Sequence, residues 1–99
     1  MRSLKCFKSY KVLGLSLRVG EWYKIYTNSY NVNKFWLAKF YGISENGCFL
    51  HKDNSYVVDG AGVRLYPTHG YNSYPLCLIG SIRSIELVDW EYVEGIITF

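Results

Sequence analysis

The clearest pattern of hydrophobic and polar positions lies in the middle of the chain. An apolar run begins at Phe35, is interrupted by the polar triplet Glu45-Asn46-Gly47, and then resumes for three residues. Asn-Gly between two strand-like runs is the strongest short-range signal for a β-hairpin, because a type I′ turn needs positive φ angles at both central residues. The pattern therefore predicts a central hairpin over residues 35–52, with a two-residue turn at Asn46-Gly47 and with Tyr41 opposite Lys52.

Both faces of this hairpin are apolar. Alternation along the strands places one set of large side chains on each side. One face carries Phe35, Leu37, Tyr41, Ile43 and Leu50, with Lys39 among them, and the other carries Trp36, Ala38, Phe40 and Phe49. The first strand is therefore either covered on both sides, or it bends strongly at Gly42 and is shared between two halves of a barrel.

Shorter strand patterns flank the hairpin. Clean alternation predicts a half-buried strand from Lys11 to Val19, and the spacing over residues 79–88 predicts a strand, a bulge or short 3₁₀ turn, and a further strand. The other predicted strands cover residues 22–26, 56–58, 63–66, 76–79, 88–93 and 96–99. We expect an all-β fold: a small, strongly bent antiparallel barrel of five to seven short strands around the hairpin at residues 35–52.

The composition supports one folded domain. Of the 99 residues, 49% are hydrophobic and 18% aromatic, with ten tyrosines, three tryptophans and only two prolines. Such a composition argues against disorder and favours strands over helices. A chain of this length can bury a core without a disulfide or a metal. We expect a single domain over residues 1–99, in which residues 1–9 form either a short strand or a basic arm.

The charge is distributed unevenly. The net charge is +3, but the first 20 residues carry five basic side chains and no acidic one, so the rest of the chain carries −2. A basic N-terminal segment can bind nucleic acid, or it can pair in the fold with the acidic C-terminal segment, which is the simpler interpretation. Three cysteines, no apolar signal segment and no run of about 18 apolar residues predict a cytoplasmic protein with reduced thiols and no membrane association.

Residues 19–25 (Val-Gly-Glu-Trp-Tyr-Lys-Ile), followed by the Trp- and Phe-rich hairpin, resemble the opening of SH3-like small β-barrels. The likeness is one of strand pattern and extends over residues 12–93. The chain is also similar to short, aromatic-rich, single-domain proteins encoded by bacteriophages. This resemblance implies a non-catalytic protein that binds a host or phage component, with a regulatory or inhibitory role in the host cytoplasm. The polyproline-binding signature of SH3 domains is not evident, so no binding residue is carried over.

The cysteines and histidines give only a weak signal for a metal or catalytic site. Cys48 and His51 have ligand-like spacing, and His69 and Cys77 could complete a tetrahedral zinc site. The predicted register puts Cys48 and His51 on opposite faces, and the other two lack the close spacing of zinc motifs, so we expect no metal. A Cys-His-Asp set can be written from these residues, but there is no strained elbow, no Gly-rich phosphate loop and no paired carboxylate motif. We therefore expect neither an enzyme nor a bound cofactor.

The pattern favours recognition of a protein partner. The longest segment without a strand pattern covers residues 67–75, and it displays aromatic side chains among Gly, Asn and Ser, where packing alone does not require them. The candidate partner-binding residues are Tyr30, Tyr41, Lys52, His69, Tyr71 and Tyr74. Self-association through an unpaired terminal strand at Ile96–Phe99 is a related expectation.

The alternative is binding of single-stranded nucleic acid. Small barrels bind it by stacking bases on aromatic side chains beside basic groups. The candidate residues for this function are Lys5, Lys8, Lys11, Arg18 and Lys39. The positive charge is modest, and every charged residue after Arg83 is acidic, so a protein partner remains the favoured class.

Overall fold

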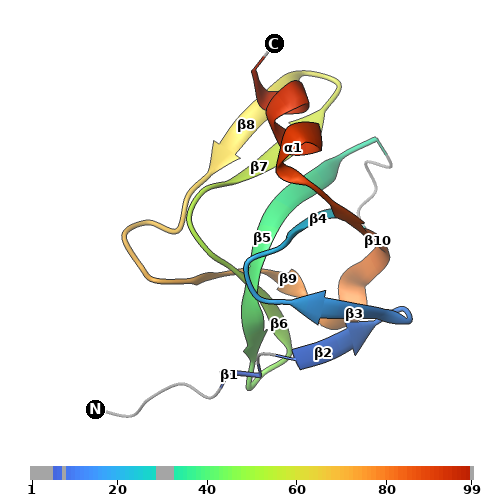
Figure 1. Cartoon of the computed structure of the whole chain (residues 1–99), viewed down its shortest axis with the longest axis vertical. Helices are drawn as coiled ribbons and strands as arrows, with labels where there is room; N and C mark the ends of the chain where they lie inside the picture. Colours follow the sequence, from blue (N-terminus) through green and yellow to red (C-terminus); the bar gives the residue numbers. More distant parts are fainter. Residues whose placement is uncertain (1–5, 8, 29–32, 99) are drawn as a thin grey trace.

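The computed structural model describes residues 6–7, 9–28 and 33–98, which form ten strands, one 3₁₀ turn and one α-helix (Figure 1). The strands are β1 (Cys6–Phe7), β2 (Ser9–Val12), β3 (Leu15–Arg18), β4 (Trp22–Thr27), β5 (Phe35–Ser44), β6 (Cys48–His51), β7 (Ser55–Asp59), β8 (Gly62–Tyr66), β9 (Tyr74–Leu78) and β10 (Ile82–Val88). The 3₁₀ turn η1 (Ile79–Ser81) separates β9 from β10, and the helix α1 (Trp90–Ile97) follows β10. All described strand pairs are antiparallel, so the all-β class is confirmed. Part of the expected N-terminal arm, β1, is a strand paired with β5.

Strand β5 is the hub of the sheet. Hydrogen-bonded neighbours follow the order β10-β4-β5-β6-β9, while β1 and β7 also pair with β5. The pairing with β6 shifts register between Phe40 and Gly42, which leaves Tyr41 as the extra residue of a bulge, and a bulge bends its strand. The first half of β5 therefore pairs with β4 and β7, and the second half with β1 and β6. The sheet does not close: β9 and β10, at the ends of the path, share no described pairing, and a barrel is not shown.

The central hairpin forms as predicted, but its register is shifted by one residue. Ile43 faces Phe49 and Gly42 faces Leu50, whereas the sequence predicted that Tyr41 would face Lys52. The turn contains three residues rather than two: the N–H of Gly47 donates to the carbonyl of Ser44 at 2.9 Å, and the φ of Gly47 is 85°. A glycine in the left-handed region also closes three-residue hairpin loops, so Asn-Gly fits both turn types and does not fix the register.

The predicted single strand from Lys11 to Val19 is wrong. The segment is a hairpin, in which β2 and β3 pair across a turn at Leu13-Gly14 with φ angles of 51° and 83°. Positive φ at two consecutive residues is the signature of a type I′ turn, whose twist matches that of the flanking strands. Val12 and Leu17 from this hairpin enter the core.

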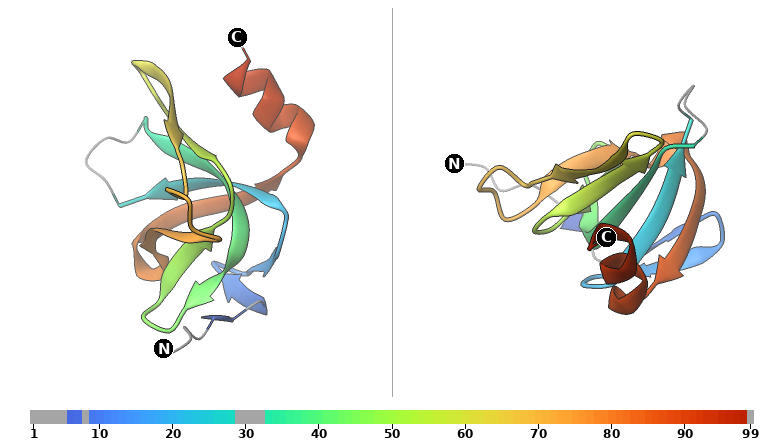
Figure 2. Two further views of the ribbon diagram at one scale, coloured as in Figure 1. Left: turned by 90° about the vertical axis from the view of Figure 1, so that its left-hand side faces the viewer. Right: turned by 90° about the horizontal axis from the view of Figure 1, so that it is seen from above.

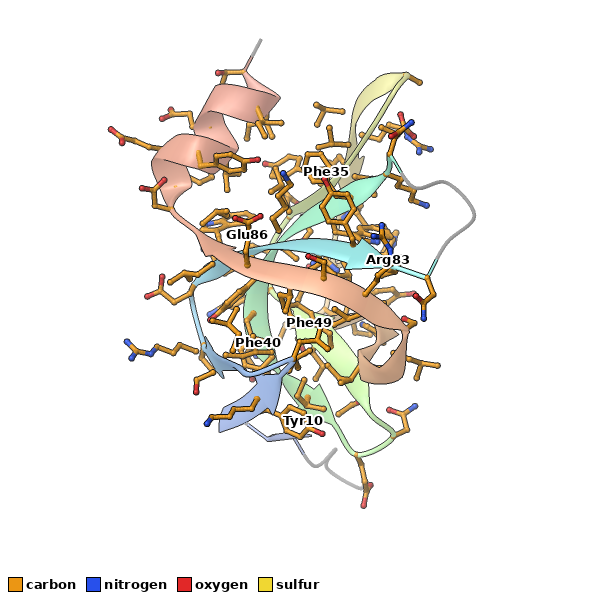
Figure 3. All side chains as sticks on the ribbon, turned by 90° about the vertical axis from the view of Figure 1, so that its right-hand side faces the viewer. Tyr10, Phe35, Phe40, Phe49, Arg83 and Glu86 are labelled. Carbon is orange, nitrogen blue, oxygen red and sulfur yellow. The ribbon has the colours of Figure 1, made fainter. Side chains whose placement is uncertain are left out.

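The main core lies between the two halves of the bent sheet. Its buried members are Val12, Leu17, Tyr23, Ile25, Ala38, Phe40, Ile43, Phe49, Leu76 and Ile82. Phe40 is central to this core: its ring centroid lies 5.1 Å from that of Phe49 and 6.3 Å, edge to face, from that of Tyr23 (Figure 3). The buried hydroxyl of Tyr23 accepts the backbone N–H of Arg18 at 2.8 Å, which satisfies the polar end of an otherwise apolar side chain.

The C-terminal segment is a helix, so both strands predicted after residue 88 are wrong. The carboxylate of Asp89 accepts the N–H of Tyr92 at 2.9 Å, the geometry of a helix N-cap. Val93 is fully buried, and the indole of Trp90 packs on that of Trp22 at the start of β4. Figures 1 and 2 show α1 at the same end of the molecule as the β7–β8 hairpin, opposite β1, β2 and β3.

This helix removes the edge that the sequence predicted for self-association. Ile96 and Ile97 belong to the helix, and Phe99 lies outside the described residues. The helix instead packs against β4, where Trp90 contacts Trp22 and the Lys24 ammonium lies 5.6 Å from the centre of the Tyr92 ring. The bulge or short 3₁₀ turn predicted within residues 79–88 is confirmed by η1 and by a register shift between Ile82 and Ser84.

Candidate functional site

The segment between β8 and β9 is a tight, uncharged loop. The N–H of Tyr71 donates to the carbonyl of Thr68 at 3.1 Å, and the two residues between them, His69 and Gly70, have φ angles of 56° and 84°. Positive φ at both central residues matches a type I′ turn, and Gly70 adopts it without steric cost. Thr68 is buried at the start of this turn, so the turn is fixed to the body of the protein while its tip is exposed.

Aromatic side chains gather on this loop. The ring centroids of His69 and Tyr74 lie 5.0 Å apart, and those of Tyr71 and Tyr74 lie 5.8 Å apart. Tyr41 joins them from the bulge of β5, since the Asn72 side chain donates to its hydroxyl at 3.2 Å. We call Tyr41, His69, Tyr71, Asn72 and Tyr74 the loop cluster. Tyr71 is its most exposed tyrosine, at 65% of its full surface.

Four of the six predicted partner-binding residues thus come together. Lys52 does not: its side chain is half-buried and no described contact joins it to the loop cluster, while its backbone N–H donates to the carbonyl of Lys39. The prediction that Lys52 faces Tyr41 failed because the hairpin register is shifted. Tyr30 lies outside the described residues.

The buried side chain of His51 packs against the aromatic residues of the loop cluster. His51 is fully buried on β6, with its ring 5.1 Å from that of Tyr66 and 6.5 Å from that of Tyr74. Its Nδ1 shares a hydrogen bond of 2.7 Å with the hydroxyl of buried Ser55, whereas Nε2 has no hydrogen-bond partner within the described residues. Burial, and to a smaller extent the nearby His69, lower the pKa of His51 to about 4. No local pattern in the sequence indicated this support.

The chemistry of these groups does not suit catalysis. His51 and Ser55 have the spacing of a base and a nucleophile, but both are fully buried, so a substrate cannot reach them. Cys48 and Cys77 are free thiols, and burial raises the pKa of Cys77 to about 12, which leaves it protonated near neutral pH.

The four candidate zinc ligands, Cys48, His51, His69 and Cys77, do not come together either. Across residues 6–7, 9–28 and 33–98, no group of three or more His, Cys, Asp or Glu side chains is placed to hold a metal ion.

A hollow of about 410 Å³ lies beside the loop cluster. It is lined by Ser44, Glu45 and Asn46 from the turn of the central hairpin and by Leu50, Ser73 and Pro75. Leu50 and Pro75 are register partners on β6 and β9, so they supply its apolar surface, and the turn residues supply polar groups around it. The hairpin and the recognition loop predicted from the sequence therefore border one concave site.

The candidate nucleic-acid residues are spread over two places. Lys11 and Arg18 lie on the exposed face of the β2–β3 hairpin, away from buried Val12 and Leu17. Lys39 lies on β5, where its ammonium is 3.4 Å from a carboxylate oxygen of Asp53 and 5.6 Å from the centre of the Trp22 ring. Lys5 and Lys8 lie outside the described residues.

The expected pairing between the two chain ends is not seen in the described part. The described ion pairs are Lys39–Asp53 and Arg64–Asp59, and neither joins the N-terminal segment to the C-terminal one. The basic side chains of the β2–β3 hairpin therefore remain available to an anion.

The described part of the chain contains no helix with the length and apolar character needed to cross a membrane. Comparisons with protein-family models, with curated proteins and with solved structures found no match to this chain.

Proposed function

We propose that this chain is a non-catalytic binding module that recognises a protein partner through the loop cluster. The observation that carries the proposal is the gathering of aromatic side chains from β5 and from the 67–75 loop around exposed Tyr71. Tyrosine brings a large contact area with few rotatable bonds, which is why it dominates the binding loops of antibodies together with Ser, Gly and Asn. Loop 67–75 has this composition (Pro-Thr-His-Gly-Tyr-Asn-Ser-Tyr-Pro).

The absence of charge in the loop favours a protein over nucleic acid at this site. Residues 67–75 contain no Lys, Arg, Asp or Glu. Binding to phosphates depends on Lys and Arg, whereas the centres of protein interfaces are depleted in charge and enriched in aromatic residues. The neighbouring hollow, with Leu50 and Pro75, offers a place for an apolar side chain of the partner.

Contacts between loop 67–75 and the body of the protein favour a preformed binding surface. The hydroxyl of Tyr66 donates to the carbonyl of Pro75 at 3.2 Å, and the ring of Tyr66 packs against those of His51 and Trp36. Holding a loop in its binding conformation reduces the entropy lost on association. Tyr71 and Tyr74 are therefore presented on a rigid base.

The test is capture of a partner by matched tyrosine variants. The chain is immobilised and exposed to a bacterial lysate, a source that the phage resemblance suggests, with and without nuclease. We expect Tyr71→Ala to lose the captured protein and Tyr10→Ala to keep it, because Tyr10 is also exposed, at 43%, but lies on β2. The dissociation constant of the purified partner is then measured for both variants. The proposal is wrong if Tyr71→Ala and Tyr74→Ala bind the partner as tightly as the wild type does.

Binding of single-stranded nucleic acid is the second candidate. It is favoured by Lys11 and Arg18, which share the exposed face of one hairpin and have no described acidic partner. Affinity for a labelled oligonucleotide should then fall steeply with salt, through counterion release, and Lys11→Ala with Arg18→Ala should weaken it. The Tyr71→Ala variant should leave this affinity unchanged, which separates the two functions.

Three further expectations rest on the sequence pattern and remain predictions. They are an SH3-like barrel, a regulatory or inhibitory role against a host or phage component, and a cytoplasmic location.

A further inference from the structure

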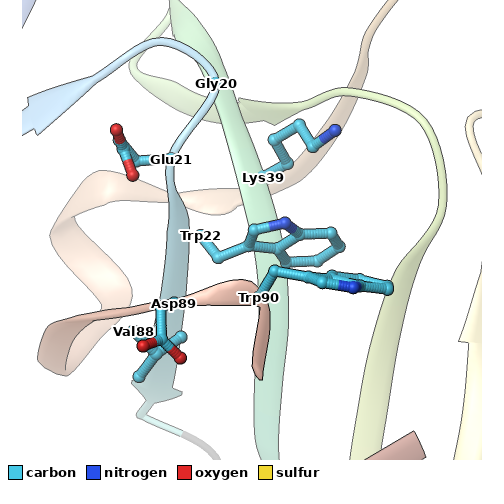
Figure 4. Close-up of a pocket in the computed structure, with 7 residues that line it drawn as sticks. All are labelled: Gly20, Glu21, Trp22, Lys39, Val88, Asp89 and Trp90. Carbon is cyan, nitrogen blue, oxygen red and sulfur yellow. The ribbon is translucent and has the colours of Figure 1, made fainter. Parts of the chain in front are cut away.

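A second hollow lies beside Lys39 in the middle of β5, where β10 passes into α1 (Figure 4). Its volume is about 480 Å³, ample for one long side chain. The side chains that line it include Glu21, Trp22, Lys39, Asp89 and Trp90. None of these residues belongs to the loop cluster.

Two indole rings form one wall of this hollow. The centroids of Trp22 and Trp90 lie 5.6 Å apart with 39° between the ring planes, and Tyr56 packs 6.3 Å from Trp22. Trp90 remains 47% exposed. The face of an indole carries partial negative charge and attracts cations more strongly than other aromatic rings do. Lys39 shows this attraction already, since its ammonium lies 5.6 Å from the centre of the Trp22 ring.

The charged groups of the hollow leave an excess of negative charge. Lys39 is paired with Asp53, and Figure 4 shows its ammonium directed away from Glu21. Asp89 uses Oδ1 to cap α1, which offsets the positive end of the helix, and within the described residues its Oδ2 has no hydrogen bond. Glu21 is exposed and takes part in no described ion pair. An anion would therefore be repelled, and a cation attracted.

We infer that this hollow binds an arginine side chain of a partner. The apolar stem of arginine can lie along the indole wall, and the carboxylates of Glu21 and Asp89 among the lining residues supply the negative charge that attracts its guanidinium. A planar guanidinium stacks on aromatic faces and makes paired hydrogen bonds with carboxylates, which an ammonium cannot do. Arginine and tryptophan are also the residue types most enriched among the energetically dominant contacts of interfaces.

The test uses two small probes that differ in charge and little in shape. N-acetyl-arginine amide is titrated against the whole chain, and N-acetyl-citrulline amide, its neutral near-isostere, is the matched control. Tryptophan fluorescence is the readout, because two of the three tryptophans line the hollow. We expect a saturable change in fluorescence with the arginine probe. The citrulline probe should bind at least about fivefold more weakly. Equal binding of both probes, or no saturable change with arginine, overturns the inference.

Charge variants locate the site. Asp89→Asn removes the charge and keeps a good N-cap residue, so the helix should persist. This variant and Glu21→Gln should each weaken the arginine probe about threefold, while Glu91→Gln, on the same helix but outside the hollow, should leave it unchanged. If Glu91→Gln weakens the probe as much, the effect is one of overall charge and the inference fails. If N-acetyl-lysine amide binds as tightly as the arginine probe, the argument from the planar guanidinium fails.

Discussion

Burial of His51 should make the stability of this protein depend on pH. In the folded chain His51 is enclosed by β6, β7 and the 67–75 loop, with Ser55, Tyr66, Tyr74 and His69 as its polar or titratable neighbours. No Asp or Glu is among these described neighbours, so no opposite charge there stabilises an imidazolium. Below the ordinary histidine pKa, the unfolded chain therefore takes up a proton that the native chain does not bind.

The size of the effect follows from the two pKa values. The native pKa of His51 is about 4 and the ordinary value is 6.5. Because the native pKa is the lower one, the stability is fully present above pH 6.5, decreases as the pH falls through the window between 6.5 and 4, and levels off below it. The whole loss amounts to about 3 kcal/mol, with a slope of at most about 1.4 kcal/mol per pH unit. A loss of this size is a large part of the stability of a small domain.

The assay is urea unfolding, followed by tryptophan fluorescence, at pH 7, 6, 5 and 4. The reference is the double variant His51→Leu with Ser55→Ala, which removes both partners of the buried hydrogen bond and so leaves no unsatisfied group. Subtracting one pH profile from the other removes the contribution of the carboxylates to the pH dependence of stability, because they titrate alike in both proteins. We expect the difference to change by about 3 kcal/mol between pH 7 and pH 4. A flat difference, or an NMR titration giving His51 a pKa near 6.5, would refute the reasoning.

Three further predictions concern the helix, the turns and the thiols. Asp89→Ala should lower the free energy of unfolding by about 1 kcal/mol because it removes the N-cap, and urea unfolding should show Asp89→Asn close to the wild type. Gly47→Ala should destabilise by about 1 kcal/mol, since a Cβ is unfavourable at a φ of 85°, whereas Gly95→Ala should stabilise α1 by a similar amount; the same sign for both would contradict the turn geometry. Cys77, with a pKa of about 12, should have roughly one thiolate in ten thousand molecules at pH 8, so mass spectrometry after iodoacetamide treatment should find it modified no faster than the protein unfolds.

The sequence predicted strands well and their terminations poorly. Asn46-Gly47 identified the central hairpin, but the same dipeptide closes loops of two or three residues, so the register was one residue off. Leu13, Leu15 and Leu17 keep alternating through a turn that contains no Asn or Asp, which hid the β2–β3 hairpin.

The helix was missed because its residues are strand formers. Trp90, Tyr92 and Val93 favour strands intrinsically, and tertiary packing overrides that preference. The available signals were the helix-capping Asp89 and the spacing of Trp90, Val93 and Ile97, which places three apolar residues on one helical face.

The candidate site was predicted only at its surface. Tyr71, Tyr74 and His69 were found because aromatic residues in a polar loop have no packing reason to be there. Tyr41 reached the same site through a bulge, not through the predicted pairing with Lys52. The buried pair of His51 and Ser55 depends on the fold of β6 against β7 and the loop, which no local pattern encodes.

The sharing of β5 has a consequence for how the molecule unfolds. A strand that pairs with four others cannot leave one half of the sheet without disturbing the other, because the same backbone crosses both. Opening one half of the sheet alone therefore has a high free energy, and the two halves should unfold as one cooperative unit. The loop cluster and the hollow beside α1 lie on opposite halves of this unit. A ligand bound at either site should therefore slow hydrogen exchange of the slowly exchanging amide protons in both halves.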